Sequence, residues 1–240
     1  MAGNLIRFVE HLRTEGYHPR SDKHSNALAD VIVADLLETC AQLHPMADSG
    51  RLVYDQNFTI TTGTSEWNSD LVLGLAPPDT AAPRSGASIR RTRPSTIHLA
   101  VEIKSIMTEH RKAVKNRKRD LEAHHDHVHR YSAAAIAAGV FVVNQAAMFK
   151  SPLRTDLTEH KNAKALVSHC LLQARSLSHR TGPEGQGLDA AAVIVVDMDN
   201  VHLQNTRLVT TSPAPPVGDP LHYDAFIQSL CSLYRDRFLD

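Results

Sequence analysis

The run from residue 97 to residue 143 constrains the fold more than any other part of this chain. Residues 97–104 (IHLAVEIK) form a short apolar run that is typical of a strand, and residues 140–143 (VFVV) form a second one. The charged run between them, residues 108–138, is long enough for a helix of several turns. A strand, such a helix and a second strand make a βαβ unit, in which the strands are parallel and the crossover is right-handed. This order predicts an α/β fold.

Further helices and strands are predicted on both sides of this unit. A long first helix is expected over residues 25–43, where apolar residues recur at helical spacing. Strands at 51–61 and 70–75, connected through residues 62–69, are expected to pair as a hairpin or meander. The remaining elements are a helix at 156–178, an apolar strand at 190–197 and a last helix at 221–238. We therefore expect one domain over residues 1–240, with a central mixed sheet flanked by helices.

Residues 77–95 (PPDTAAPRSGASIRRTRPS) have the composition of a loop. Proline, glycine, serine and arginine dominate this stretch, which offers too few apolar side chains to pack a core. We interpret it as a mobile basic loop inserted between strands.

Charge and cysteine content narrow the class of protein. Lys plus Arg equals Asp plus Glu, so the formal net charge is zero and a polyanionic partner must be met by a local basic patch. Cys40, Cys170 and Cys231 lie far apart and lack the close spacing of zinc or redox motifs, so we expect reduced core thiols. No apolar run approaches the ~18 residues of a membrane span, and the first residues do not resemble a secretion signal. A cytoplasmic protein with no membrane partner is expected.

The segment Val101-Glu102-Ile103-Lys104 carries the most chemical information. Side chains alternate along a strand, so Glu102 and Lys104 share one face. A charge in an apolar strand requires a partner or a metal ion. Asp70, on the preceding predicted strand, supplies a second carboxylate. Asp70 and Glu102 are therefore expected to converge on one divalent cation beside Lys104.

Asp70, thirty-two positions before Glu102-Ile103-Lys104, together with the order helix, hairpin, strand, helix, strand, resembles the PD-(D/E)xK nuclease superfamily. This superfamily includes most type II restriction endonucleases. The resemblance covers roughly residues 25–145, although Ser69 stands where the family usually has proline. The triplet Glu159-His160-Lys161 also fits (D/E)xK, but it lies in a helical run without an upstream strand carboxylate.

The resemblance implies a restriction-endonuclease-like core (αβββαβ) and Mg²⁺-dependent hydrolysis of phosphodiester bonds. Asp70 and Glu102 would bind Mg²⁺, and Lys104 would orient the attacking water and stabilise developing charge. We expect a site-specific type II restriction endonuclease that cleaves double-stranded DNA as a homodimer, with a companion DNA methyltransferase acting on the same site. Further residues of the site are expected just past the strand at 140–143 and on the first helix. The candidates are Asn144 and Gln145 after the strand, and Asp30, Asp35 and Glu38 on the helix.

Two clusters of arginine and lysine indicate where DNA would bind. Seven cations lie between residues 104 and 119, against the single carboxylate of Glu109. Helical spacing puts four of them on one face, which would follow a phosphate backbone. The ordinary explanation is a solvated helix face. The four helical residues are Arg111, Lys115, Lys118 and Arg119, and the predicted loop adds Arg84, Arg90, Arg91 and Arg93, which would reach a groove.

Three other functions stay open at this point. One is a repair, processing or modification-dependent nuclease of the same superfamily, and another is a DNA-binding module that does not cleave. A third is a metal-dependent phosphohydrolase built on the histidine cluster at 124–129. In that case His125 and His129, four residues apart on a helix with Asp126 and Glu122 nearby, would bind zinc or another transition metal.

Overall fold

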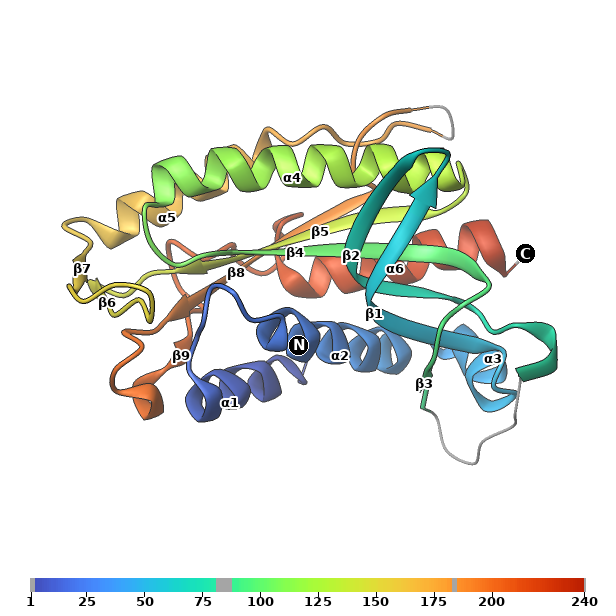
Figure 1. Ribbon diagram of the computed structural model, residues 1–240, viewed down its shortest axis with the longest axis horizontal. Coiled ribbons are helices and arrows are strands. Elements are labelled where there is room, and N and C mark those ends of the chain that lie inside the picture. Colours follow the sequence, from blue (N-terminus) through green and yellow to red (C-terminus); the bar gives the residue numbers. More distant parts are fainter. Residues whose placement is uncertain (1–2, 81–87, 183–184, 240) are drawn as a thin grey trace.

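A seven-stranded mixed sheet forms the centre of the molecule (Figure 1). The computed structural model describes residues 3–80, 88–182 and 185–239. The strand order in this sheet is β3-β1-β2-β4-β5-β8-β9, and β6 and β7 form a separate pair. The helices are α1 (Leu5–Glu15), α2 (Lys23–Thr39), α3 (His44–Asp48), α4 (His110–Tyr131), α5 (Ala163–Arg175) and α6 (Tyr223–Phe238). The strands are β1 (Leu52–Thr62), β2 (Ser65–Leu75), β3 (Arg90–Arg91), β4 (Thr96–Ile106), β5 (Ile136–Asn144), β6 (Met148–Phe149), β7 (Thr158–Glu159), β8 (Ala190–Asp197) and β9 (Arg207–Leu208).

The β4–α4–β5 segment forms the predicted parallel unit. The register sets Glu102 opposite Gly139 and Lys104 opposite Phe141. β5 is buried at every position, which explains its continuous apolar sequence. The helix ends at Tyr131, earlier than predicted, because the alanine-rich residues after it lead into the strand. The predicted α/β class with a central mixed sheet flanked by helices is confirmed.

Helices cover both faces of the sheet. α1, α2 and α6 pack on one face through a large apolar cluster that includes Leu36, Val101 and Phe226. α4 and α5 pack on the other face through a second cluster around Leu121 and Phe141. Figure 1 shows these layers, with α4 on one side of the strands and α2 and α6 on the other.

Several boundaries differ from the prediction. α1 was not predicted, so the helix expected first, now α2, is the second. β2 begins at Ser65, because β1 and β2 are joined by the two-residue turn Gly63-Thr64, where Gly63 has φ 58°. The predicted connection at 62–69 is therefore wrong. β7 lies near the start of the helix predicted at 156–178, and α5 begins only at Ala163, so the prediction that Glu159-His160-Lys161 lies in a helical run is wrong.

The predicted basic loop at 77–95 contains a short strand. Arg90 and Arg91 form β3, which pairs in parallel with Val53 and Tyr54 of β1 at the edge of the sheet. Residues 81–87, Arg84 among them, lie outside the described residues.

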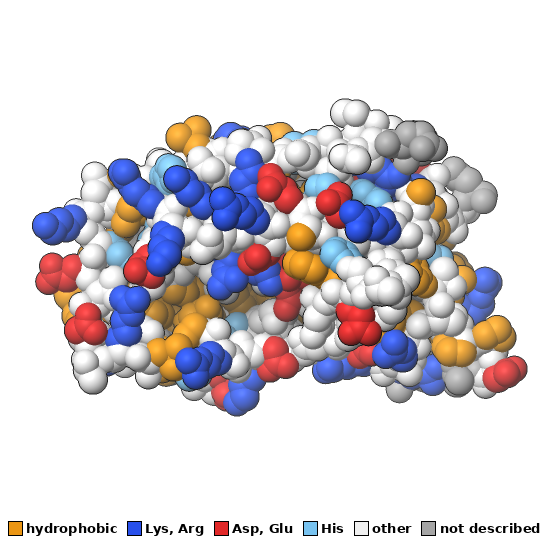
Figure 2. All heavy atoms as spheres, turned by 45° about the horizontal axis from the view of Figure 1, so that its top comes forward, with side chains coloured by type: hydrophobic (Ala, Val, Ile, Leu, Met, Phe, Trp, Pro, Cys, Tyr) orange, Lys and Arg blue, Asp and Glu red, His pale blue; other side chains and the backbone are white. Residues whose placement is uncertain are grey.

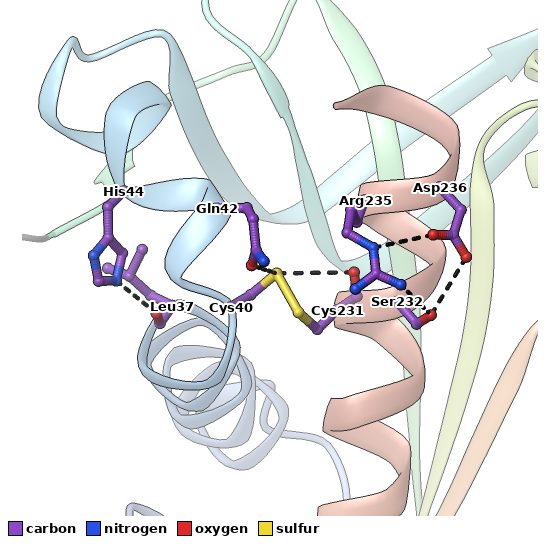
Figure 3. The surroundings of a disulfide bond; sticks show 8 residues. All are labelled: Leu37, Cys40, Gln42, His44, Cys231, Ser232, Arg235 and Asp236. Atoms are coloured by element: carbon purple, nitrogen blue, oxygen red, sulfur yellow. Dashed lines mark hydrogen bonds and ion pairs between the residues drawn. A yellow bond between two sulfur atoms is a disulfide. The ribbon is translucent and has the colours of Figure 1, made fainter. Parts of the chain in front are cut away.

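Cys40 and Cys231 form a disulfide, which corrects the prediction that all three cysteines are reduced thiols (Figure 3). Cys40 directly follows α2, Cys231 lies in α6, and their Cα atoms are 5.4 Å apart. Although 191 positions separate them, they meet because α2 and α6 pack on the same face of the sheet. Sequence spacing cannot reveal a pairing that depends on helix packing. Cys170 is free and buried, as predicted.

Within the described residues, no helix is both long enough and apolar enough to cross a lipid bilayer.

Candidate active site

Strands β2 and β4 separate at the residues predicted to carry chemistry. Their antiparallel ladder runs from Leu75 and Thr96 to Leu71 and Val101 and ends there, while β2 continues to pair with β1 up to the hairpin turn. In Figure 1 the β1–β2 hairpin rises from the sheet toward α4, whereas β4 continues to its own end. Beyond Val101, β4 keeps only its partner β5 among the strands of the described residues. Residues 102–106 of β4 therefore have no strand partner among the described residues on the β2 side, and we call this unpaired edge the notch.

A bend in β1 causes this separation. Asn57 has φ 53°, in the left-handed region that non-glycine residues rarely occupy. Its side-chain amide donates to Asp22 Oδ2 (2.9 Å) and Asn26 Oδ1 (3.1 Å) at the start of α2, which holds the bend. The β1–β2 ladder omits the facing pair Asn57 and Asp70. Asp70 is thus released from regular strand pairing at the mouth of the notch.

The Asp70 carboxylate binds across to β4. Its Oδ2 atom accepts a hydrogen bond from the Ile103 amide at 2.7 Å, in place of the backbone carbonyl that a regular ladder would provide. The Ser69 hydroxyl similarly donates to the Val101 carbonyl at 3.2 Å. These two side chains fix Asp70 beside the segment that contains Glu102 and Lys104.

Glu102 and Lys104 form an ion pair of unequal exposure. The Lys104 ammonium contacts Glu102 Oε1, and the Trp67 indole N–H donates to Glu102 Oε2 at 3.3 Å. The Glu102 side chain is 2% exposed, whereas that of Lys104 is 21% exposed. The cation therefore reaches the solvent of the notch while its partner is buried.

Burial and mutual repulsion govern the ionisation of these acids. Burial, and after it the nearby Glu102 carboxylate, raise the pKa of Asp70 to about 6 against the opposing effects of Lys104, the Ile103 amide and Ser25. Burial also raises the pKa of Glu102, against the effect of Lys104. Burial disfavours the charge of Lys104, but Glu102 and Asp70 together hold its pKa above the ordinary value. Two acids thus share one lysine.

This donor set fits a magnesium ion. Mg²⁺ prefers hard oxygen ligands and is commonly held by one or two carboxylates while it keeps several waters. Asp70 and Glu102 supply two such groups, and their mutual repulsion is what a divalent cation would relieve. No cluster of three or more His, Cys, Asp or Glu side chains suited to a metal ion occurs in the part of the chain that the structure describes. Asp70 and Glu102 would therefore need water or substrate oxygens to complete the coordination.

Trp67 and His124 complete the surroundings of Glu102, and sequence reasoning assigned neither of them to this site. His124 is fully buried, with Nε2 3.3 Å from the Ala100 carbonyl and Nδ1 3.7 Å from Glu102 Oε2. Burial lowers the pKa of His124 to about 3, so the ring is neutral. The Trp67 ring lies 5.2 Å from the His127 ring, which also contacts Ser65 at 2.6 Å. The hairpin tip is thus attached to α4 above the site. The turn at Gly63-Thr64 was the signal that would have placed Trp67 on a strand.

In the part of the chain that the structure describes, the histidine cluster forms no group of three or more His, Cys, Asp or Glu side chains placed to hold a metal ion. The rings of His125 and His129 are 6.1 Å apart. His129 instead contacts Asp189 at 3.2 Å, and Asp189 also pairs with Arg237 at the end of α6. These contacts connect α4, β8 and α6.

The basic residues on α4 differ in whether their side chains have ionic or hydrogen-bond partners. Arg111, Lys115 and Arg119 are exposed and have no ionic or hydrogen-bond partner within the described residues. Lys118 donates to the Ser176 carbonyl (2.8 Å) and lies 3.6 Å from Glu122. Figure 2 shows Lys and Arg side chains gathered over the half of the molecule where α4 begins.

Arg90 and Arg91 of the predicted loop lie at the opposite edge of the sheet from β9. Arg91 pairs with Asp55 at 3.7 Å, next to Arg90 in β3. The Arg93 guanidinium lies 4.4 Å above the ring of Phe58, which the register sets opposite Ser69. Arg93 is therefore one strand away from Asp70.

The two accessory candidates at the end of β5, Asn144 and Gln145, differ in their side-chain hydrogen bonds. Asn144 is fully buried, and its side chain binds the backbone of Ala146 and Met198, so it connects two loops. Gln145 follows it, and its buried side-chain oxygen has no hydrogen-bond partner among the described residues.

None of the three acids of α2 contacts Asp70. Asp30 accepts from Gln56 and Tyr54, and Asp35 accepts from Asn4 and Tyr223. Glu38 accepts from Asn4 near the other end of α2, roughly 20 Å along the helix from Ser25. Ser25, not an acid, is the residue of α2 whose side chain acts on Asp70.

Comparisons with protein-family models, with curated proteins and with solved structures found no match for this chain.

Proposed function

We propose that this protein is a metal-dependent endonuclease that hydrolyses phosphodiester bonds in double-stranded DNA. One observation carries the proposal: Asp70, Glu102 and Lys104 meet where β2 leaves β4, and the Lys104 side chain is 21% exposed. Apart from the short α3 and β3, the succession α2–β1–β2–β4–α4–β5 is also the order expected for a nuclease core of the PD-(D/E)xK type.

The ordinary explanation, an exposed ion pair at a strand end, does not account for this geometry. Glu102 is almost completely buried, and removing a carboxylate from water costs several kcal/mol unless its partners compensate. Apolar residues of similar size would stabilise the strand equally well or better. The presence of two acids and one lysine at this position therefore supports a chemical role.

Each residue has a distinct part in the proposed reaction. Bound Mg²⁺ would neutralise charge on the scissile phosphate and lower the pKa of a water molecule. Asp70 and Glu102 would hold the ion, each fixed in turn by a hydrogen bond from Ile103 or Trp67. Lys104, the exposed member of the pair, would contact the attacking water and the phosphoryl oxygens. The unpaired cations of α4 would bind the phosphate backbone nearby.

The finer proposal is a site-specific type II restriction endonuclease. A symmetric duplex site is matched by a two-fold enzyme, so we propose that the protein acts as a homodimer with a companion methyltransferase. Arg93, Arg90 and Arg91 are candidates for contacts outside the cleaved bond.

Cleavage of a mixed DNA panel tests this function. Plasmid, phage, methylated, branched and single-stranded DNA are incubated with Mg²⁺ or EDTA, using wild type and the variants Asp70→Asn and Lys104→Met. We expect discrete fragments that require Mg²⁺ and a loss of at least about 100-fold in each variant.

Other outcomes would revise or reject the proposal. Nicking of branched or modified DNA alone would retain the site but replace restriction by repair or modification-dependent cleavage. Binding of DNA without cleavage would support a non-catalytic module. Cleavage that both variants retain would reject this active site.

A further inference from the structure

A polar hollow of about 270 Å³ lies at the end of β4, where the chain passes into α4 (Figure 1). Ser105 belongs to its lining and directly follows Lys104, on the stretch of β4 that β2 has left. α4 contributes Lys112, Asn116 and Arg117, and the loop between α1 and α2 contributes Tyr17. The hollow therefore adjoins the notch of the candidate active site.

The distance of the hollow from Lys104 is comparable with the spacing of nucleotides along a DNA strand. The lining residues of β4 and its extension, Ser105 and Met107, lie one and three positions beyond Lys104. With about 3.3 Å per strand residue, this is about 3–10 Å. Successive nucleotides of one DNA strand advance by about 3.4 Å along the helix axis, and their phosphates lie farther apart than this along the backbone. The phosphate next to the scissile one would therefore reach the hollow.

The side chains around the hollow are mainly hydrogen-bond donors. Lys112 is exposed and has no ionic partner within the described residues. Arg117 contacts Asp120 at 3.0 Å, yet its side chain remains 45% exposed and lies close enough to Tyr17 to act on its phenol. The acid of the lining, Glu109, lies 3.6 Å from Arg154. The neighbouring Asn116 amide adds a neutral donor, while the Ser105 hydroxyl is hydrogen-bonded to Tyr17. Charge and donor geometry thus favour an anion with several oxygens.

Aromatic packing makes one wall of the hollow rigid. Tyr17 stacks on His24, with ring centroids 5.0 Å apart, and meets Phe149 edge-on at 6.1 Å. The Tyr17 backbone N–H also donates to Asn200 Oδ1 at 2.7 Å, which restrains Tyr17 in its loop. A wall fixed before binding lowers the entropic cost of ordering a ligand.

We propose that this hollow binds a phosphate of the cleaved strand next to the scissile phosphate, through Lys112 and Arg117. The proposal rests on the proposed nuclease function and assigns a second contact by which the substrate strand is held. Lys104 and the hollow would then fix two phosphates of one strand, which sets the direction in which DNA crosses the notch.

The double variant Lys112→Gln/Arg117→Gln tests the assignment, with Arg7→Gln/Arg51→Gln as a control of equal charge change at two exposed cations that have no assigned role. Duplex binding is measured by fluorescence anisotropy in EDTA, so that no cleavage occurs, after thermal melts show that both variants fold. We expect the hollow variant to bind about 10-fold or more weakly than the control. Equal loss in both variants would mean general electrostatic attraction and would overturn the proposal.

Single methylphosphonates, which neutralise one phosphate each, locate the contact. Scanned along the strand, they should weaken wild-type and control binding at one position beside the cleaved bond, and leave the hollow variant unaffected there. The same pattern of loss in all three proteins would overturn the assignment. Displacement of the duplex by micromolar inorganic phosphate or a mononucleotide would also overturn it, because the hollow would then bind a free phosphate compound.

Failure of this inference is distinguishable from failure of the proposed function. If wild type cleaves DNA and Asp70→Asn does not, while the hollow variant matches its control, only the hollow assignment is wrong. If wild type neither binds nor cleaves any DNA, both are wrong.

Discussion

At the scale of single residues, the surroundings of Glu102 make the site specific. Its two carboxylate oxygens are held by different partners, Lys104 at the notch and Trp67 on the hairpin. Neither partner alone would position both oxygens. The indole N–H therefore has a role that ring packing cannot replace.

We predict that Trp67→Phe lowers the single-turnover cleavage rate by about 10-fold, because one charge-assisted hydrogen bond to Glu102 is lost. Phenylalanine retains the aromatic contact with His127. The affinity for DNA should stay within about two-fold, since Trp67 is assigned no contact with DNA. Rate and affinity are measured on the same duplex, with the Mg²⁺ dependence. A wild-type rate in Trp67→Phe would remove it from the positioning of Glu102.

His98 gives a prediction about pH. Its ring stacks on Phe238 at 3.9 Å and contacts the Tyr234 hydroxyl at 2.7 Å, and burial lowers its pKa to about 4. The unfolded chain takes up this proton near pH 6.5, whereas the folded state does so only near pH 4. The stability from His98 is therefore complete above pH 6.5 and is lost as the pH falls from 6.5 to 4.

The free energy of unfolding of His98→Gln should therefore fall less steeply over this range than that of wild type. Urea denaturation at several pH values measures both slopes. Equal slopes would contradict the buried, neutral state of His98.

At the scale of elements, the close approach of β2 and β4 just before they separate depends on Gly74. The register shifts between Leu73 and Gly74, and a Cβ atom at Gly74 would lie 1.7 Å from the Thr96 carbonyl oxygen. We predict that Gly74→Ala destabilises the fold by about 3 kcal/mol or more, since backbone must move to accommodate it. Gly3→Ala, with nothing within 4 Å of the new atom, is the control and should have almost no effect. Chemical denaturation compares the two, and equal midpoints would refute this packing.

Sequence reasoning was most successful where the elements are most regular. The apolar strands β4, β5 and β8 and the long charged helix α4 follow from the sequence pattern, and so does the parallel order of β4 and β5. The convergence of Asp70 and Glu102 followed from placing them on neighbouring strands.

The parts that could not be predicted depend on contacts between distant segments. The bend at Asn57 is held by Asp22 and Asn26, so no local pattern announces that β2 leaves β4 there. His124 reads as one of several helical histidines until α4 is packed on the sheet beside Glu102. Trp67 was expected in the connection at 62–69, whereas the turn comprises only Gly63-Thr64 and Trp67 lies in β2.

At the scale of the whole molecule, the disulfide connects the residue after α2 to α6 on one face of the sheet (Figure 3). Closing so long a loop restricts the unfolded chain, so we predict that Cys231→Ser lowers the free energy of unfolding by about 2–5 kcal/mol. Dithiothreitol should lower the stability of wild type by a similar amount and leave Cys231→Ser unchanged. Thiol titration in non-reducing denaturant should find one free thiol in wild type, from Cys170. Three free thiols would contradict the pairing.

If the carboxylate of Glu102 serves catalysis, the chain contains a matched control for testing it. Glu159-His160-Lys161 repeats the triplet, with Glu159 exposed at the end of β7, outside the main sheet. The decisive measurement is the rate of DNA cleavage in Mg²⁺ by Glu102→Gln and Glu159→Gln, both shown to fold. We predict that the cleavage rate falls by at least about 100-fold in Glu102→Gln and stays at the wild-type value in Glu159→Gln. Equal cleavage rates in Glu102→Gln and Glu159→Gln would contradict a catalytic role of Glu102.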